Sequence, residues 1–521
     1  MITRLEKLFL FISFFILIAT VFWLLAPNDK IRYHLIITGM NRAKIHPFKA
    51  KFKPYSGKTM GGAAAMATAI KEATASFNND SYDIISLGTE LSGTADAFFT
   101  KGESIVKIMN ALQVKTMLLS NIDFTYGCER LEELSKIASF SFLSSNITQQ
   151  TTQTPPNWLK DQIIFEISND IKMGVIGITP INTPNLTPKE NIQNLVFEAP
   201  LTTLKEKVDK MRAEKIQVIT LLTQYSKDHL KPEEWQEITE IGPDICIMLD
   251  QELEAPSPFI KDGIIVYTIS SYNQTKEIDI LSIEVDTKSK KLTGLSSQRI
   301  PTNLADIDPD PAMEKVIEEA TEEFIVRKNT IIGSFEADYS RSYNYECPIA
   351  NFIADAIKEK TGAQIAMQNS GGIQGNISSG TFTVGDLYTM LPFDNKVVLM
   401  NLKGEDILNI LKISASRQRG VIQVSGLKYS FEHKSPKDYK LLSARLSNAD
   451  STESEIVPDA IYKVAINNFL AEGGDNFIPF RNGEILSVHG SQRDILEEKI
   501  KTDAASSPLR ISYEKRIIIE D

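Results

Sequence analysis

The chain has 521 residues, which is enough for two or three domains of ordinary size. Hydrophobic residues make up 42% and charged residues 24%, proportions typical of a globular protein with substantial buried cores. The net charge of −11 argues against a nucleic-acid binder, because a phosphate backbone requires a basic stripe and none is visible. Single nucleotides are not excluded, since a few local donors can hold one phosphate. The three cysteines, Cys128, Cys246 and Cys347, have the spacing of neither a disulfide framework nor a zinc site.

The N-terminal segment is strongly apolar. Residues 8–26 carry no charge and are dominated by Phe, Leu and Ile, and they follow Arg4 and Lys7. A helix of this length spans about 28 Å at ~1.5 Å per residue, close to the hydrocarbon thickness of a bilayer. A cleaved secretory signal is the alternative, but residues 23–27 offer a poor cleavage site. We therefore expect a membrane anchor in residues 1–30, with the soluble domains on the extracytoplasmic (periplasmic or cell-surface) side.

Short apolar runs then alternate with helical stretches as far as residue 300, a pattern that predicts sheets covered by helices. The expected strands are Ile31–Ile37, Asp83–Leu87, Thr116–Ser120, Lys172–Ile178, Gln217–Leu222 and Asp244–Leu249. The expected helices are Gly61–Ser76 and Ser104–Leu112, and residues 149–157, rich in Thr, Gln and Pro, predict a surface loop.

A domain boundary is expected near residues 301–330. Residues 301–311 hold three prolines and three aspartates, which is typical of a turn-rich linker. Residues 312–327 have the periodicity of one acidic amphipathic helix. We expect one domain over residues 31–300, a linker and bridging helix over 301–330, and a second domain over 331–521.

Four segments of the last 155 or so residues carry the clearest motifs. They are Met367–Gln374, Leu391–Asn395, Gln423–Leu427 and Asn467–Phe477. In this order and spacing they resemble the C-terminal, nucleoside-recognising domain of the 5′-nucleotidase family. The resemblance implies a mixed α/β domain that binds substrate but carries no metal.

Carried onto this sequence, the resemblance implies a substrate pocket. Asn369 would contact the nucleoside, Phe393 and Phe469 would stack on the two faces of the base, and Asp475 would accept hydrogen bonds from ribose hydroxyls. Taken singly, each Phe is more often a core residue and the Asp a turn residue, so the joint occurrence in order carries the prediction.

Two further features of the same loops bear on the ligand. Gly371 and Gly372 would let the backbone approach a ligand closely. Gln374 stands where the family has an Arg, which removes a fixed positive charge and a bidentate donor. We therefore expect a neutral nucleoside to be held better than a phosphate.

The N-terminal half is similar to the metal-dependent phosphoesterase domain of the same family. The similar segments are Gly61–Ala65, Lys101–Glu103, Met109–Leu112, Phe124–Gly127 and Phe142–Asn146. The resemblance implies a four-layer α/β/β/α domain. The expected fold class is therefore α/β and α+β: an N-terminal anchor helix, this four-layer domain, and a C-terminal mixed α/β domain.

The positions at which the resemblance implies metal ligands mostly carry side chains that do not bind metals. They are Met40, Arg42, Thr89, Asn121, Gln224, Asp250 and Glu252. Ile122 and Thr125 stand where the family has its catalytic His and the Asp that orients it. A two-metal site needs several carboxylates and imidazoles, and the five histidines of the chain form no His-x-His or Asp-x-His pair.

These substitutions predict a pseudoenzyme: a membrane-anchored protein without catalytic residues or metal cofactor that binds a nucleoside-like ligand or a protein partner. The alternative is an active 5′-nucleotidase-type hydrolase with Zn or Mn at a rearranged site that includes Asn121, Asp123, Asp250 or Glu252. A third hypothesis is a structural protein in which neither half binds a ligand.

Overall fold

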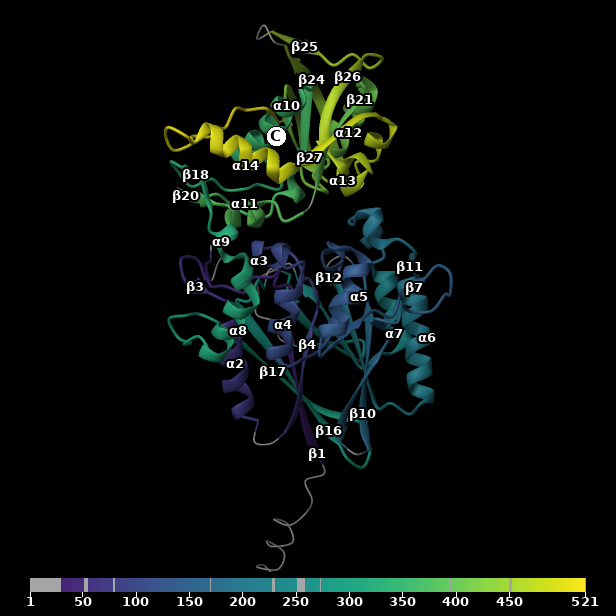
Figure 1. The fold of residues 1–521 in the computed structure, drawn as a ribbon. Helices are drawn as coiled ribbons and strands as arrows, with labels where there is room; N and C mark the ends of the chain where they lie inside the picture. The colour runs from purple at the N-terminus through teal and green to yellow at the C-terminus, as the bar shows by residue number, and fades with distance from the viewer. Residues whose placement is uncertain are drawn as a thin grey trace, which may run out of the picture.

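The computed structural model describes residues 30–520, apart from residues 51–54, 78–79, 169, 227–229, 251–257, 272, 394 and 449–451. The expected anchor in residues 1–30 lies outside the described residues except for its last position. Of the helices that the structure describes, none is long and apolar enough to cross a membrane. Figure 1 shows two lobes, the N-lobe (residues 30–301) and the C-lobe (residues 331–520), and residues 302–330 form the segment of chain that connects them.

The N-lobe contains a seven-stranded sheet of order β17-β16-β1-β4-β5-β6-β8. Its strands in this order are Leu292–Pro301, Glu277–Asp286, Lys30–Thr38, Ser81–Ser86, Val114–Leu118, Ser141–Leu143 and Leu159–Lys160. Strands β1, β4, β5, β6 and β8 run parallel to one another. Strand β16 pairs antiparallel with β1, and β17 pairs antiparallel with β16. The carboxyl ends of the parallel strands therefore meet at one edge, where ligands bind in open α/β sheets.

A second sheet of the N-lobe has six strands in the order β14-β15-β13-β12-β10-β9. These strands are Phe259–Lys261, Ile264–Ser270, Ile245–Asp250, Val218–Ser226, Ile171–Ile178 and Ile163–Ser168. The two sheets pack face to face around an apolar core that includes Leu35 and Ile37 of one sheet and Val175 and Tyr267 of the other. Continuous apolar runs such as β1 are expected for strands covered on both faces.

Helices cover the outer faces of both sheets. The first sheet is covered by α2 (Ala63–Ala75), α4 (Glu103–Ala111) and α5 (Gly127–Ile137), and the second by α6 (Pro200–Ala213) and α7 (Pro232–Ile241). Small strand pairs flank the sheets: β2 and β3 (Phe48–Lys49, Thr59–Met60), and β7 and β11 (Ile147–Gln149, Leu195–Phe197). The N-lobe thus has the expected four layers, α/β/β/α.

The C-lobe is built on a mixed five-stranded sheet of order β22-β19-β26-β21-β27. These strands are Ile422–Ser425, Ile365–Asn369, Ile461–Asn467, Lys396–Lys403 and Glu484–Ser491. A four-stranded sheet, β25-β24-β23-β28, comprises Glu453–Glu455, Asp438–Ser447, Leu427–Ser435 and Ile517–Glu520, and β18 and β20 (Ile331–Phe335, Gly380–Thr383) form a pair. The main helices are α10 (Pro348–Thr361), α11 (Val384–Met390), α12 (Gly404–Ala415) and α14 (Gln492–Asp503). The mixed α/β class expected for this half is confirmed.

The connecting segment differs from the single helix expected over residues 312–327. It consists of α8 (Pro311–Thr321), a 3-10 turn η4 (Glu322–Phe324) and α9 (Ile325–Lys328). The Thr321 hydroxyl donates to the Ile317 carbonyl oxygen at 2.8 Å, a local bond that bends helices, and the chain turns there. The turn lets the Phe324 ring stack on Phe99 of the N-lobe, with ring centroids 5.8 Å apart. A tertiary contact therefore overrides the helical periodicity.

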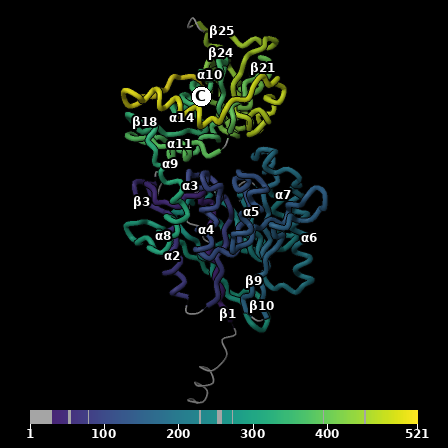
Figure 2. Tube along the Cα trace, in the orientation of Figure 1, coloured from purple at the N-terminus to yellow at the C-terminus, as the bar shows by residue number. Residues whose placement is uncertain are grey.

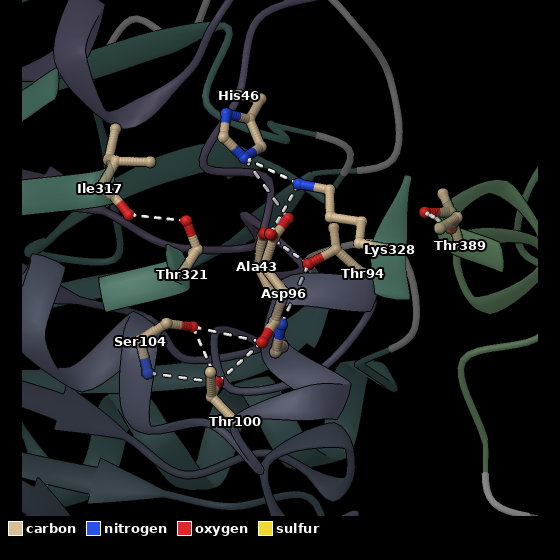
Figure 3. Close-up of polar contacts among 12 residues, drawn as sticks. Ala43, His46, Thr94, Asp96, Thr100, Ser104, Ile317, Thr321, Lys328 and Thr389 are labelled. Carbon is tan, nitrogen blue, oxygen red and sulfur yellow. Dashed lines mark hydrogen bonds and ion pairs between the residues drawn. The ribbon is translucent and has the colours of Figure 1, made fainter. Parts of the chain in front are cut away.

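One short N-lobe helix, α3 (Ala95–Phe99), contacts both the connecting segment and the C-lobe. Lys328 Nζ donates to Asp96 Oδ1 at 2.6 Å and to His46 Nε2 at 3.1 Å, as Figure 3 shows. The Arg493 guanidinium of α14 lies 4.0 Å from the centroid of the Phe98 ring. In the tube view of Figure 2 the connecting segment runs along the N-lobe before it enters the C-lobe. The domain boundaries given above stay a prediction.

Candidate ligand site between the lobes

A cavity of about 590 Å³ lies between the lobes, and we call it the interlobe cavity. Its N-lobe wall comes from α3 and from loops at the carboxyl ends of the parallel strands, and its C-lobe wall comes from the loops after β19, α11 and β26. All six residues expected to bind substrate line it: Asn369, Gly371, Gly372, Phe393, Phe469 and Asp475. The fold therefore brings together residues that are more than 100 positions apart in the sequence.

Asn369 is the last residue of β19 and belongs to a buried amide network. Its Oδ1 accepts hydrogen bonds from Asn467 Nδ2 at 3.0 Å and from Gln368 Nε2 at 3.2 Å. Its Nδ2 donates to Asp475 Oδ2 at 2.6 Å. Because both ends of the amide are engaged, the orientation of Asn369 is set by the protein.

Asp475 lies in the 3-10 turn η6 (Gly474–Asn476) in the left-handed region, with φ +53°. Short polar residues such as Asp tolerate this region better than most. Burial raises the pKa of the Asp475 carboxyl, and the hydrogen bond from Asn369 acts in the opposite direction. The carboxylate is thus held at the cavity surface with one oxygen already engaged.

The two expected stacking rings reach the cavity from different elements. Phe469 lies on the short helix α13 (Asn468–Ala471), and its ring lies so close to Gly474 that a side chain at position 474 would overlap it. Phe393 follows α11, and its carbonyl oxygen accepts a 2.7 Å hydrogen bond from Arg493 Nη1. Both residues are half-buried, and both line the cavity.

The glycines of the first loop leave room for neighbouring side chains of the protein. A Cβ at Gly372 would lie 2.6 Å from Gln368 Nε2 and 2.9 Å from Asn369 Oδ1, so glycine clears room for the amide network. A Cβ at Gly371 would lie 3.2 Å from Asp475 Oδ2. The close approach that requires glycine here is to the protein's own side chains.

On the N-lobe wall, Arg42, Asn121, Ile122 and Thr125 line the interlobe cavity. Arg42 reaches across to the C-lobe, where its Nη1 donates to Gln374 Oε1 at 2.5 Å. The sequence could not reveal this pairing, because the two residues are 332 positions apart.

Most of the other positions at which the resemblance implies metal ligands have partners within the N-lobe. Met40 is buried in the apolar core between the two sheets. Gln224 Nε2 donates to Leu87 O at 2.5 Å and to Thr89 Oγ1 at 3.3 Å. The buried Asp250 accepts a 3.4 Å hydrogen bond from Thr268, and Glu252 lies outside the described residues.

Asp123 organises the loops behind the wall. Its Oδ1 accepts from the backbone N–H groups of Glu90 and Leu91, and its Oδ2 accepts from the backbone N–H groups of Thr89 and Ser120 and from the Ser120 hydroxyl, all at 2.6–3.0 Å. Within the described part of the chain, no group of three or more His, Cys, Asp or Glu side chains could hold a metal ion.

A buried carboxyl group that we did not anticipate lies next to Asp123. Glu90 accepts hydrogen bonds from Ser86 Oγ at 2.7 Å and from Asn41 Nδ2 at 3.0 Å. Burial raises the pKa of Glu90 to about 8, and the nearby Asp123 adds to the rise. A charged residue four positions after the apolar strand β4 was the available signal. Lys101 and Asn395 also line the interlobe cavity, and both belong to the motifs noted above.

Comparison with known proteins supports the resemblance. Residues 325–481 match the family model described as "5′-nucleotidase, C-terminal domain". The human 5′-nucleotidase is 26% identical over 84% of this chain and 82% of its own length. Cell wall protein Lmo0130 of Listeria monocytogenes is 24% identical over 87% of this chain and 65% of its own length. The chain spans 65% of the length of this protein and 27% of the length of another curated relative.

Among solved structures, the 5′-nucleotidase precursor of Thermus thermophilus has the same fold. It superposes with a TM-score of 0.81 at 21% identity, covering 94% of this chain and 99% of that one. At this identity the likeness concerns the fold alone. The matched C-terminal domain and the relatives that align along most of the chain lead to one conclusion: the chain belongs to the 5′-nucleotidase family.

Proposed function

We propose that the protein binds a nucleoside or nucleotide in the interlobe cavity without hydrolysing it by two-metal chemistry. The observation that carries this proposal is the composition of the two walls. The C-lobe wall keeps the side chains suited to a base and a ribose, whereas the N-lobe wall presents Arg42, Ile122 and Thr125. The protein is then a pseudoenzyme of its family.

On the C-lobe wall, each half-buried Phe ring offers a π face to the base, and a stack of this kind contributes roughly 1–3 kcal/mol. The Asp475 carboxylate can accept hydrogen bonds from two ribose hydroxyls. Asn369 holds this carboxylate in place through their 2.6 Å hydrogen bond.

The described N-lobe residues do not fit the pair of divalent metals on which this family's phosphoesterases depend. Hard cations need oxygen or imidazole ligands with free lone pairs. Both oxygens of Asp123 are engaged by N–H and O–H donors, and Gln224 directs its NH₂ group into the loops. Arg42 adds a permanent positive charge at the cavity wall.

The alternative is a working phosphoesterase, and the names of the relatives favour it. It would need Zn or Mn at a rearranged site that includes Asn121, Asp250 or Glu252. For either function we place the two lobes on the extracytoplasmic side, which the cell wall relative supports. Nothing in the acidic composition favours a nucleic-acid partner.

The deciding experiment uses the purified full chain. Metal content is measured by mass spectrometry, adenosine binding by calorimetry in EDTA, and phosphate release from AMP with added Zn²⁺ or Mn²⁺. We expect adenosine to bind without metal and no phosphate release above the blank. Near-stoichiometric metal together with turnover of AMP would establish the hydrolase instead. Absence of adenosine and AMP binding would leave only a structural role.

A further inference from the structure

A second, smaller cavity of about 230 Å³ adjoins the interlobe cavity. Arg42, Ile122, Gln374 and Phe393 line both cavities, so these four residues form their common wall. The smaller cavity also lies between the lobes, since residues of both contribute to it. A ligand in the interlobe cavity could therefore extend past Arg42 into the smaller cavity.

The smaller cavity is strongly basic. Arg42, Lys44 and Lys49 come from the N-lobe and Arg341 comes from the C-lobe, whereas Asp386 is the one carboxylate among its described lining residues. The Asp386 carboxylate accepts hydrogen bonds from the backbone N–H and the hydroxyl of Thr383, which cap helix α11. We call this space the basic cavity.

The backbone sets the position of Arg42. Its N–H donates to Thr89 O at 2.8 Å, and the residue has φ +51°, in the left-handed region. Gly93 packs against it with φ +133°, and a Cβ there would lie 2.5 Å from the Arg42 carbonyl oxygen. The guanidinium is then oriented by its bond to Gln374, whose own Nε2 donates to Gly371 O at 2.6 Å.

Lys44 adds a second cation close to the first. Burial lowers the pKa of the Lys44 ammonium, and the charge of Arg42 lowers it further. Lys44 Nζ lies 4.7 Å from the centroid of the Phe48 ring. On the opposite lobe, Arg341 Nη1 donates to Ile373 O at 3.2 Å, which holds this side chain at the cavity. Cations held together in partly buried space repel one another, and a bound anion would relieve that repulsion.

We propose that the basic cavity is a metal-free anion subsite that takes the phosphate chain of a nucleoside diphosphate or triphosphate. The base and ribose of this ligand lie in the interlobe cavity, so the inference rests on the proposed function. Arg42 then supplies from the N-lobe the guanidinium that the C-lobe loop lacks at Gln374. The expectation that phosphate is held poorly is thereby reversed, because the compensating charge comes from the other half of the chain.

The test compares adenosine, AMP and ADP by calorimetry with the full chain in EDTA, at low and at high salt. We expect ADP to bind about tenfold or more tightly than adenosine at low salt, as charge-assisted hydrogen bonds predict. High salt should weaken ADP binding and leave adenosine binding nearly unchanged.

Variants then locate the subsite. Lys44→Gln and Arg341→Gln, one from each lobe, should each lower the ADP affinity about fivefold or more while adenosine affinity stays constant. Lys136→Gln, which removes the same charge from the exposed side of α5, is the matched control and should change neither. Thermal unfolding checks that each variant is folded, and the two substitutions test the subsite independently.

The outcomes separate the two proposals. Equal affinity for adenosine and ADP, or an ADP preference that survives both substitutions, overturns the anion subsite while the nucleoside site stands. Failure of adenosine, AMP and ADP alike to bind overturns the proposed function and the subsite with it.

Discussion

Asn369 donates a 2.6 Å hydrogen bond to Asp475, a residue 106 positions further along the chain. The bond joins the end of β19 to the turn after α13 and fixes a carboxylate at the surface of the interlobe cavity. It links two motifs that are separate in the sequence into one polar wall.

Asn369→Ala should weaken adenosine binding about tenfold, because Asp475 loses the donor that positions it. Calorimetry with the full chain measures the change. Asn409→Ala on α12, whose side chain accepts a bond from Lys412 at an exposed site, is the matched control. Equal adenosine affinities for Asn369→Ala and wild type would show that this wall does not recognise the sugar.

Phe469→Ala should lower adenosine affinity by about 1–3 kcal/mol, the contribution of one aromatic stack. Because the ring also covers Gly474, thermal unfolding must accompany the titration. Phe259→Ala, at a 40% exposed ring on the edge strand β14, removes an equal side chain far from the cavity. If both variants bind adenosine as wild type does, the base does not lie on Phe469.

Glu90 makes stability depend on pH near neutrality. The carboxyl has an ordinary pKa of 4.5 in the unfolded chain, and burial raises its pKa to about 8 in the folded protein. Between these values the folded state binds more protons, so the free energy of unfolding falls as pH rises. Glu90→Gln keeps a neutral group there and should flatten this dependence.

Urea unfolding at about pH 5 and about pH 8 checks the Glu90 prediction. Raising the pH from about 5 to about 8 should lower the free energy of unfolding of the wild type more than that of Glu90→Gln. The difference between these two changes should be on the order of a few kcal/mol. Glu129→Gln, at an exposed position of α5, is the control. Parallel pH profiles for wild type and Glu90→Gln would show that Glu90 ionises normally.

Lys328→Met should destabilise the protein by about 2–4 kcal/mol, because Asp96 is only 5% exposed and loses its cationic partner. Burial raises the pKa of Asp96, but the contacts with His46 and Lys328 outweigh it and leave the pKa lowered. The stabilisation is therefore present above the ordinary pKa of an Asp and is lost as pH falls through the lowered value.

Thermal unfolding measures the Lys328 effect. Adding Asp96→Asn to Lys328→Met should restore part of the loss, since no buried charge then remains unpaired. Lys315→Met on α8, where the ion pair with Glu319 is exposed, should change stability by less than about 0.5 kcal/mol. A Lys328→Met variant as stable as wild type would mean that the lobes do not depend on this contact.

Much of the N-lobe could be predicted because its strands are long apolar runs. The expected strand Ile31–Ile37 corresponds to β1, and the expected helix Gly61–Ser76 to α2, each within two residues. The strand expected at Gln217–Leu222 continues to Ser226, since Thr223 still pairs with β10 and Ser226 still pairs with β13. The local sequence pattern was sufficient to predict an element wherever its apolar residues are the ones that the fold buries.

The site was predictable only in its parts. The motifs identified Asn369, Phe393, Phe469 and Asp475, which line one wall of the cavity. Short motifs of this kind mark loops whose sequence is restricted by a ligand or by the backbone conformation. The contact between Arg42 and Gln374 depends on how two lobes meet, and the break at Thr321 depends on Phe324 reaching Phe99. Neither relationship has a local pattern.

The hydrogen bonds to Asp123 have a consequence for the engineering of this chain. The loops at Thr89 and Ser120 are folded around that carboxylate. A carboxylate introduced at position 89 would replace a hydroxyl that donates to Ser120 and would bring a like charge towards Asp123. A single substitution of this kind would thus weaken the loops before any cation could bind, so a designed metal site here would also need changes that stabilise them.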